Sequence, residues 1–246
     1  MAEIPIKLPA SWSELDDGQL AMVFRLIARE LTAPEIQTIC LIRWNKLKVI
    51  GQTDDKNFYW IKYMRQVHRV SARQIQQAAS EMAFIENVPD APVRLSRIGK
   101  HLPLAADFNE VPFEIFLYGE NLYQGYLHTE NLELLQELVQ ILYQSDDIKP
   151  ERYHCLMAFY WFAALKTMFA RQFTHFFQPI ESVQDANLLE NKSLYQKLRD
   201  TMNAQIRALT GGDITKEPTI LKMDTWRALT ELDAKAEEVE NLKKQK

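Results

Sequence analysis

Apolar residues recur at intervals of three and four positions along most of this chain of 246 residues. The clearest example is the series Leu20, Val23, Phe24, Ile27 and Leu31. This spacing puts the apolar side chains on one face of an α-helix, so it predicts amphipathic helices that pack on one another. Glycine occurs only 7 times, which argues against glycine-rich loop architectures. We therefore expect an all-α fold of about eight helices.

Capping signals divide the periodic segments into individual helices. A capping box pairs Ser or Thr with Glu or Gln three positions later. The chain offers three such pairs: Ser11 with Glu14, Thr32 with Glu35, and Ser71 with Gln74. Prolines can open helices and glycines can end them. The expected helices lie near 13–30, 33–48, 112–127 (opened by Pro112), 130–144 (capped by Thr129), 150–177 (opened by Pro150) and 185–210 (ended by Gly211), with two more beginning after Ser71 and Asp224.

Two segments interrupt this helical pattern. Residues 57–67 are aromatic and partly alternating, which is typical of a short strand or of one hairpin arm near 49–65. Residues 89–111 hold several prolines that break helices, and a connector of this length either packs on the body of the protein or contains a strand pair near 90–105. We therefore predict a minor β element.

The same features predict four regions along the chain. They are an N-terminal helical region 1–88, a proline-rich connector 89–111, a central helical core 112–210 and a C-terminal helical arm 211–246.

The motifs of common catalytic and cofactor sites do not occur in the sequence. It contains no G-x-G-x-x-G, no G-x-x-x-x-G-K-[ST], no G-x-S-x-G, no C-x-x-C and no H-E-x-x-H. Glu151 and His154 come nearest to a metal motif, because Glu-x-x-His is half of a ferritin-like di-iron element. A second such pair is missing, so we interpret this one as a satisfied or surface pair. The sequence thus favours a non-enzymatic protein with no metal or cofactor.

Several features indicate a cytoplasmic protein without membrane contact. Cys40 and Cys155 lie within apolar helical patterns, and we expect them to be free core thiols in a reducing compartment. The N-terminus lacks the basic and apolar regions of a signal peptide. The most apolar stretch, residues 155–165, has 11 residues. A membrane-spanning helix needs about 20.

Charge is distributed unevenly, although the formal net charge is only −4. Residues 43–73 contain eight basic residues but only two acidic ones, and aromatic residues are interleaved with the basic ones. Surfaces that bind single-stranded nucleic acid combine the same residue types. The candidate nucleic-acid patch comprises Arg43, Lys46, Lys48, Lys62, Arg65, Arg69 and Arg73. The same mixture also fits a solvated basic face over an aromatic core, and the negative net charge argues against a chain-wide nucleic-acid footprint.

The segment 101–147 has the opposite character, with no Lys or Arg and nine carboxylates. These are Asp107, Glu110, Glu114, Glu120, Glu130, Glu133, Glu137, Asp146 and Asp147. Two interpretations stay open for this acidic block. It either packs against the basic segment 43–73 of the same chain or meets a basic partner, and in both cases the charges would serve orientation more than stability.

Two helices are candidates for contact with a partner. The helix 150–177 is apolar around most of its circumference, which favours a central place in the core, with a partner-binding groove as the alternative. The final helix carries a narrow stripe of candidate partner-binding residues, Trp226, Leu229, Leu232 and Val239. The alternative is that this helix packs back on its own domain. We predict that Trp226 and Leu229 anchor its first turns, because an isolated helix of this length is marginal in water.

Two segments together resemble proteins of bacterial prophage tail modules. They are the opening IKLPASWSELDDGQL (6–20) and the closing MNAQIRALTGGDITKEPTILKMDTWRALTELDAKAEEVENLKKQ (202–245). In the closing segment a helix stops at a glycine turn, and a final helix reads D-x-W-x-A-L-x-x-L-x-x-x-A. The resemblance implies a helical tail assembly chaperone that keeps a tape-measure protein soluble. It implies a protein partner from the tail tube or tape measure, and it leaves the oligomeric state open.

Overall fold

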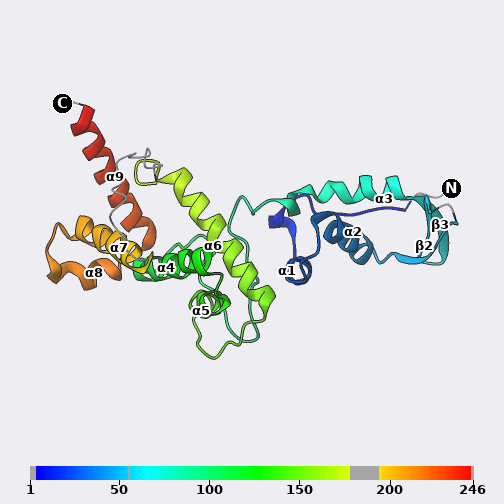
Figure 1. The fold of residues 1–246 in the computed structure, drawn as a ribbon, viewed down its shortest axis with the longest axis horizontal. Coiled ribbons are helices and arrows are strands. Elements are labelled where there is room, and N and C mark those ends of the chain that lie inside the picture. The colour runs from blue at the N-terminus through cyan, green and yellow to red at the C-terminus, as the bar shows by residue number, and fades with distance from the viewer. Residues whose placement is uncertain (1–3, 55, 178–193, 245–246) are drawn as a thin grey trace.

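The computed structural model of the protein describes residues 4–54, 56–177 and 194–244. The molecule is elongated, with a small sheet at one end and the last helices at the other (Figure 1). Helices make up 60% of the structure. The described part of the chain contains nine α-helices and one three-stranded antiparallel sheet. These observations confirm the predicted mainly helical fold with a minor β element.

The N-terminal part consists of three α-helices and the three-stranded sheet. Its elements are α1 (Asp17–Ile27), α2 (Ala33–Trp44), β1 (Lys48–Gln52), β2 (Phe58–Tyr63), β3 (Gln66–Ser71) and α3 (Ala72–Ala79), which continues into a 3-10 helix (Ser80–Glu86). The C-terminal part is helical. Its elements are α4 (Phe113–Thr129), α5 (Leu132–Leu142), α6 (Arg152–Gln172), α7 (Leu194–Thr210), α8 (Glu217–Leu221) and α9 (Thr225–Lys244).

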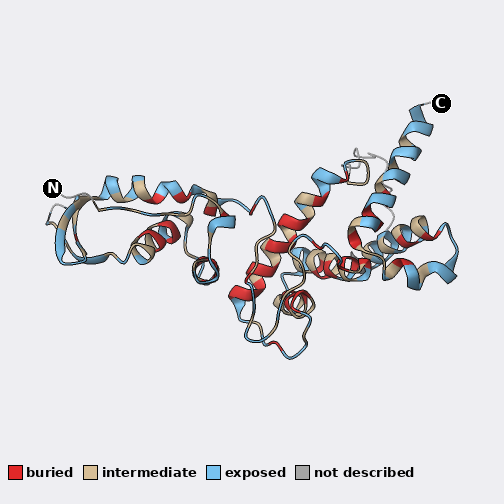
Figure 2. Ribbon diagram, turned by 180° about the vertical axis from the view of Figure 1, so that it is seen from behind, coloured by how far each residue is buried: buried red, intermediate tan, exposed pale blue. Residues whose placement is uncertain are grey.

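Helix α6 lies at the centre of the core, as its apolar circumference predicts. Buried residues follow it along most of its length (Figure 2). Trp161 and Phe162 are fully buried, and their rings contact Phe108 at centroid distances of 6.5 and 6.2 Å. Helix α4 approaches closely at Gly119, where a Cβ atom would lie 2.8 Å from the Phe162 ring. These contacts leave the centre of α6 no free groove for a partner.

The proline-rich connector packs on the body of the protein. The Trp161 indole donates a hydrogen bond to the carbonyl oxygen of Ala106 at 2.7 Å, and the Tyr143 hydroxyl bonds the carbonyl oxygen of Leu95. The connector forms no strand pair near 90–105. Backbone groups of this segment bond other elements instead: the Ser96 amide donates to the Asp17 carboxylate, and the Leu104 amide donates to the carbonyl oxygen of Leu142. A single isolated bridge joins Ile98 to His101. The predicted strand pair in this segment is therefore wrong.

The first two helices begin or end at other residues than predicted. Ser11 opens only a short 3-10 turn, and the capping box of α1 is formed by Asp16 with Gln19. Helix α2 begins as predicted, because the Glu35 carboxylate accepts hydrogen bonds from the amide and hydroxyl of Thr32. It ends at Trp44 instead of residue 48, because Lys46 adopts a left-handed conformation with φ of 53°.

Helices α5 and α6 also differ from their predicted bounds. The Thr129 hydroxyl bonds back to the carbonyl oxygen of Gly125, and Asn131 caps α5 by accepting from the Glu133 amide. Helix α6 ends at Gln172 instead of residue 177. The amides of His175 and Phe176 donate to Asp233 of α9, at 2.9 and 2.8 Å, in place of further helical bonds. For the predicted helix 185–210, residues 185–193 lie outside the described residues.

The sheet has a third strand that the sequence pattern does not predict. Strands β2 and β3 form a hairpin closed by the pair Tyr63 and Gln66, with Met64 at a φ of 52° in the turn. Glycine or asparagine normally marks such a turn, because other side chains disfavour positive φ. The sequence Met64–Arg65 gives no such signal, so a hairpin arm near 49–65 could be predicted but the position of the turn and the strand β3 after it could not.

Candidate functional site

The sheet at the end of the N-terminal part carries two different faces. Side chains alternate along each strand, and directly paired residues on neighbouring strands share a face. The pairing sets Trp60 opposite Arg69, and Lys62 opposite both Lys48 and Val67. Ile61, on the other face of the same strand, is 2% exposed. We call the face with Lys48, Phe58, Trp60, Lys62, Val67 and Arg69 the outer face.

Packing within the outer face agrees with this register. A Cβ atom on Gly51 would lie 3.8 Å from Cδ1 of Trp60, so the indole lies over the position where β1 has no side chain. The Arg69 guanidinium lies over the Phe58 ring, with its carbon 3.8 Å from the ring centroid. Trp60 remains 41% exposed. The outer face thus presents an accessible indole on the strand next to a guanidinium that lies over another ring.

A depression next to the outer face is lined by four lysines. It has a volume of about 640 Å³, and the lysines are Lys7, Lys46, Lys48 and Lys62. No carboxylate is among the described residues that line it. We call this depression the lysine pocket. It brings the N-terminal segment, the end of α2 and two strands together, and it shares Lys48 and Lys62 with the outer face.

A larger and mostly apolar pocket lies between the sheet and helices α2 and α3. Its volume is about 930 Å³, and its aliphatic lining includes Ile42, Leu47, Ile61, Val70, Ile75 and Ala78. Trp60, Val67 and Arg69 of the outer face line it as well. His68 also lines it. Among the described residues, its Nε2 atom has no hydrogen-bond partner although that atom is buried. We call this the apolar pocket. It can accept an aliphatic segment of another molecule.

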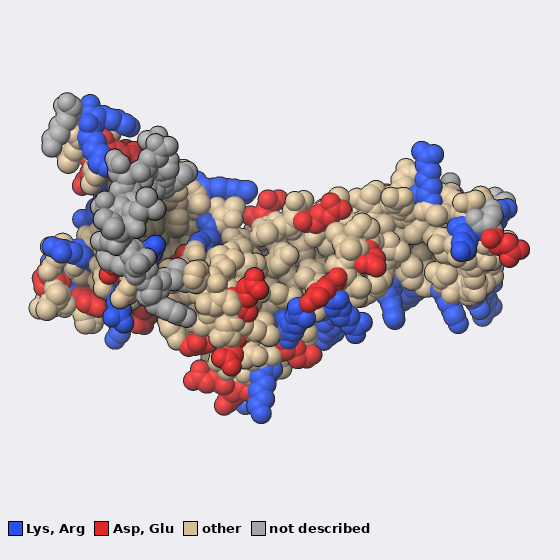
Figure 3. Space-filling view, in the orientation of Figure 1, with Lys and Arg blue, Asp and Glu red and all other residues tan. Residues whose placement is uncertain are grey.

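The seven residues of the predicted nucleic-acid patch are all exposed. Within the part of the chain that the structure describes, none of them forms an ion pair. Figure 3 shows Lys and Arg side chains around the end of the molecule that carries the sheet. The structure brings Lys46, Lys48 and Lys62 together with Lys7. The sequence pattern did not indicate Lys7, because Lys7 lies far along the chain from the basic segment 43–73.

The acidic block does not face the basic segment. Helices α4 and α5, which carry four of the nine carboxylates of the block, belong to the C-terminal part, and the sheet lies at the far end of the molecule (Figure 1). No ion pair joins the two segments among the described residues. The idea of an intramolecular pairing between the two charge blocks is therefore wrong, because the elongated fold separates them.

The predicted partner-binding residues of α9 divide into two groups. Leu229 and Leu232 are buried, and the Trp226 indole donates to the carbonyl oxygen of Asp107 at 2.8 Å. Trp226 also contacts the rings of Phe169 and Phe173 edge-on. The side chains of Trp226, Leu229 and Leu232 therefore make their contacts within the protein. Val239, in contrast, is 51% exposed.

Glu151 and His154 form the N-terminal cap of α6. The Glu151 amide donates to Nδ1 of His154 at 3.1 Å, which requires a neutral imidazole. Burial lowers the pKa of His154 from its usual value. No group of three or more His, Cys, Asp and Glu side chains suited to a metal ion occurs among the residues that the structure describes. The sequence pair is thus a capping interaction.

This cap makes a prediction about pH. A histidine whose pKa is lowered on folding binds its proton more readily in the unfolded chain, so stability falls as the pH drops through the ordinary histidine range near about 6.5. We expect the melting temperature of the wild type to fall more between neutral pH and about pH 5 than that of His154→Gln, whose amide oxygen can still accept from Glu151. An equal fall in both proteins would show that His154 does not contribute.

The two cysteines are unsuited to nucleophilic chemistry. Both are fully buried and free. Burial raises the pKa of the Cys40 thiol to about 12 and that of Cys155 to about 11. Because the thiolate is the reactive form, both thiols are inert at neutral pH. Both cysteines fill the core, as the sequence pattern predicts.

None of the described helices has the length and apolar character required to cross a bilayer. Comparison with known proteins adds no relative: no family model, no curated protein and no solved structure matches this chain.

Proposed function

We propose that this protein is a non-enzymatic interaction factor, and specifically a tail assembly chaperone that holds an aggregation-prone tape-measure protein in the cytoplasm of a bacterium or of a phage-infected cell. The apolar pocket carries the proposal. It offers about 930 Å³ lined by aliphatic side chains of the sheet, α2 and α3. A holding protein needs such a surface, because an apolar helix of the partner can be buried in it.

Two further observations support this function. The described residues hold no metal-binding cluster, and the thiols are buried with raised pKa values, so neither group supplies catalytic chemistry. The resemblance of residues 6–20 and 202–245 to prophage tail-module proteins supplies the class of partner. The tape-measure protein is long, helical and prone to aggregation when unassembled, which matches the need for an apolar docking site.

The test is co-expression with the tape-measure protein of the same phage genome. We expect the wild type to increase the soluble fraction of that protein severalfold. Ile75→Asp puts a charge into the apolar pocket, and burying an unpaired carboxylate is strongly unfavourable, so this variant should lose the effect. The matched control is Leu102→Asp, because Leu102 is 64% exposed and does not line the pocket.

Circular dichroism and thermal melting are measured on both variants first, so that loss of holding is not confused with loss of folding. A folded Ile75→Asp variant that still solubilises the tape-measure protein as well as the wild type would contradict the proposed site. If the wild type gives no increase, the chaperone function itself is wrong.

A further inference from the structure

The lysine pocket concentrates positive charge without compensation. Lys48 and Lys62 are directly paired on neighbouring strands, where like charges destabilise a sheet. Lys7 and Lys46 line the same depression, and no carboxylate of the described residues does so. All three of Lys46, Lys48 and Lys62 are exposed. An anion bound in the pocket would relieve this repulsion, and a phosphate group fits cations arranged in this way.

The outer face adds flat surfaces beside the lysines. Trp60 is 41% exposed and stands two positions from Lys62 on the same face of β2, which is a distance of about 7 Å along a strand. Arg69 lies opposite Trp60, and its guanidinium is held over Phe58. Indole rings and guanidinium planes are surfaces on which nucleic-acid bases stack. Phosphate-binding cations and base-stacking planes therefore lie next to each other.

We propose that the lysine pocket and the outer face together form a binding site for single-stranded nucleic acid, with phosphates in the pocket and bases stacked on Trp60 and Arg69. An acidic peptide would neutralise the lysines but would leave the indole unused. A duplex would also leave it unused, because its bases are stacked on one another. The sheet is three strands wide, about 10 Å between its outer strands, which suits two or three unpaired bases.

The net charge of −4 does not oppose this site. The acidic block lies in the C-terminal part, far from the sheet (Figures 1 and 3). At physiological salt, charges separated by more than about 8 Å are largely screened from each other. Of the two acidic residues in the basic segment, the structure describes Asp54, which lies in the loop between β1 and β2. Trp60, Val67 and Arg69 of the outer face also line the apolar pocket of the proposed chaperone function, whereas Lys48 and Lys62 do not. The Lys48→Ala/Lys62→Ala variant therefore tests the nucleic-acid site separately from the chaperone function.

The experiment measures fluorescence anisotropy of labelled oligonucleotides of about 12 residues, as single-stranded DNA, single-stranded RNA and duplex DNA. The salt concentration runs from about 50 mM to about 200 mM. We expect single strands to bind at low salt, duplexes to bind at least tenfold more weakly, and affinity to fall steeply with salt. The double variant Lys48→Ala/Lys62→Ala should make the negative slope of log affinity against log salt shallower by about 1.4, because each phosphate contact on a single strand contributes about −0.7 to that slope.

Two comparisons separate this site from general electrostatic attraction. The control Lys222→Ala/Lys243→Ala removes the same charge from exposed positions in the C-terminal part, and it should bind like the wild type. Trp60→Ala should weaken binding roughly 5- to 100-fold with an unchanged salt slope, because it removes stacking and no charge. Trp60→Phe should restore most of the affinity, and circular dichroism checks that each variant is folded.

Several results would overturn the proposal. They are the absence of binding to any oligonucleotide at about 50 mM salt, equal binding of duplex and single strand, and equal losses in the pocket and control double variants. Displacement of the single strand by polyglutamate at an equal concentration of charge would also overturn it, because the surface would then be a site for acidic peptides.

Discussion

Replacing Trp161 by alanine should lower the free energy of unfolding by about 4 kcal/mol, because large-to-small changes at buried aromatic residues cost about 3–5 kcal/mol. The Trp161 side chain is fully buried, and its ring contacts Phe108 and Tyr143 edge-on. Its indole also donates to the carbonyl oxygen of Ala106. The substitution therefore opens a cavity where α6 meets the connector and leaves that carbonyl without its donor. Urea denaturation followed by circular dichroism measures the loss.

The matched control is Trp60→Ala, which removes the same side chain from the outer face. Trp60 is 41% exposed, so we expect a loss of about 1 kcal/mol or less. If Trp161→Ala cost as little as Trp60→Ala, α6 would not be the centre of the core. The comparison also supplies the folded Trp60 variant that the oligonucleotide measurements need.

Helix α9 gives the second large expected effect. Trp226→Ala should cost about 3 kcal/mol, because the indole packs against Phe169 and Phe173 and donates to Asp107. The start of the helix is also held by Thr225, whose hydroxyl and amide both donate to the carbonyl oxygen of Val111 at 2.7 and 2.8 Å. The first turns of α9 are thus fixed to the connector and to the end of α6, as the sequence predicts. Thermal melting and urea denaturation measure the change.

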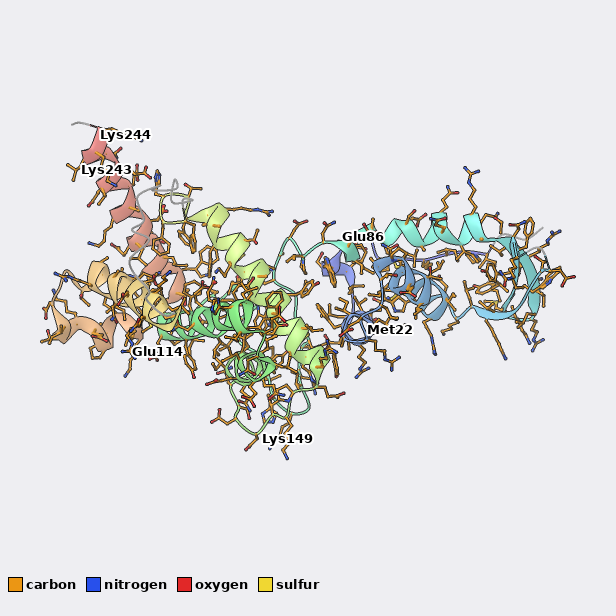
Figure 4. The ribbon with its side chains drawn as sticks, in the orientation of Figure 1. Met22, Glu86, Glu114, Lys149, Lys243 and Lys244 are labelled. Atoms are coloured by element: carbon orange, nitrogen blue, oxygen red, sulfur yellow. The ribbon has the colours of Figure 1, made fainter. Side chains whose placement is uncertain are left out.

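Truncation after Val239 is the companion experiment. Lys243 and Lys244 stand at the free end of α9 (Figure 4), and Leu242 is 62% exposed. The truncation removes the contact of Glu240 with Nδ1 of His175 at 3.2 Å, a partly exposed pair that is worth about 1 kcal/mol or less. We expect the truncation to lower the free energy of unfolding by no more than that amount, as measured by thermal melting and urea denaturation. Unfolding on truncation, or no loss in Trp226→Ala, would mean that the far end of α9 anchors the helix and its first turns do not.

Most of the helices could be predicted because their signals are local. The capping boxes of Thr32 with Glu35 and of Ser71 with Gln74 form as the sequence predicts. Gly211 ends α7 at a φ of 64°, and Asp224 caps α9 through the Arg227 amide. Each of these interactions joins residues within four positions of one another. A pattern in the sequence therefore describes them almost completely.

Other bounds depended on competition from distant residues. Ser11 offers a good capping pattern, but the Trp12 indole bonds the carbonyl oxygens of Phe84 and Asn87, about which the local sequence says nothing. Helix α6 stops early because Asp233 accepts the next amides. At the end of α6 a long-range hydrogen bond replaces the local one that the pattern predicts. At Ser11 other local partners replace it, because the Ser11 hydroxyl pairs with that of Ser13 and the Glu14 carboxylate accepts from the Ala10 amide.

The candidate sites also combine features that the local sequence sets with features that long-range contacts set. The sequence by itself determined that residues 43–73 are basic and aromatic, that α6 is a core helix, and that common catalytic motifs are missing. Only the tertiary structure decided that Lys7 joins Lys46, Lys48 and Lys62, that Trp60 and Arg69 share one face, and that the acidic block lies far from them. The physical reason is that strand register and the meeting of distant segments are set by long-range contacts, whereas helical periodicity and caps are set by residues within one turn.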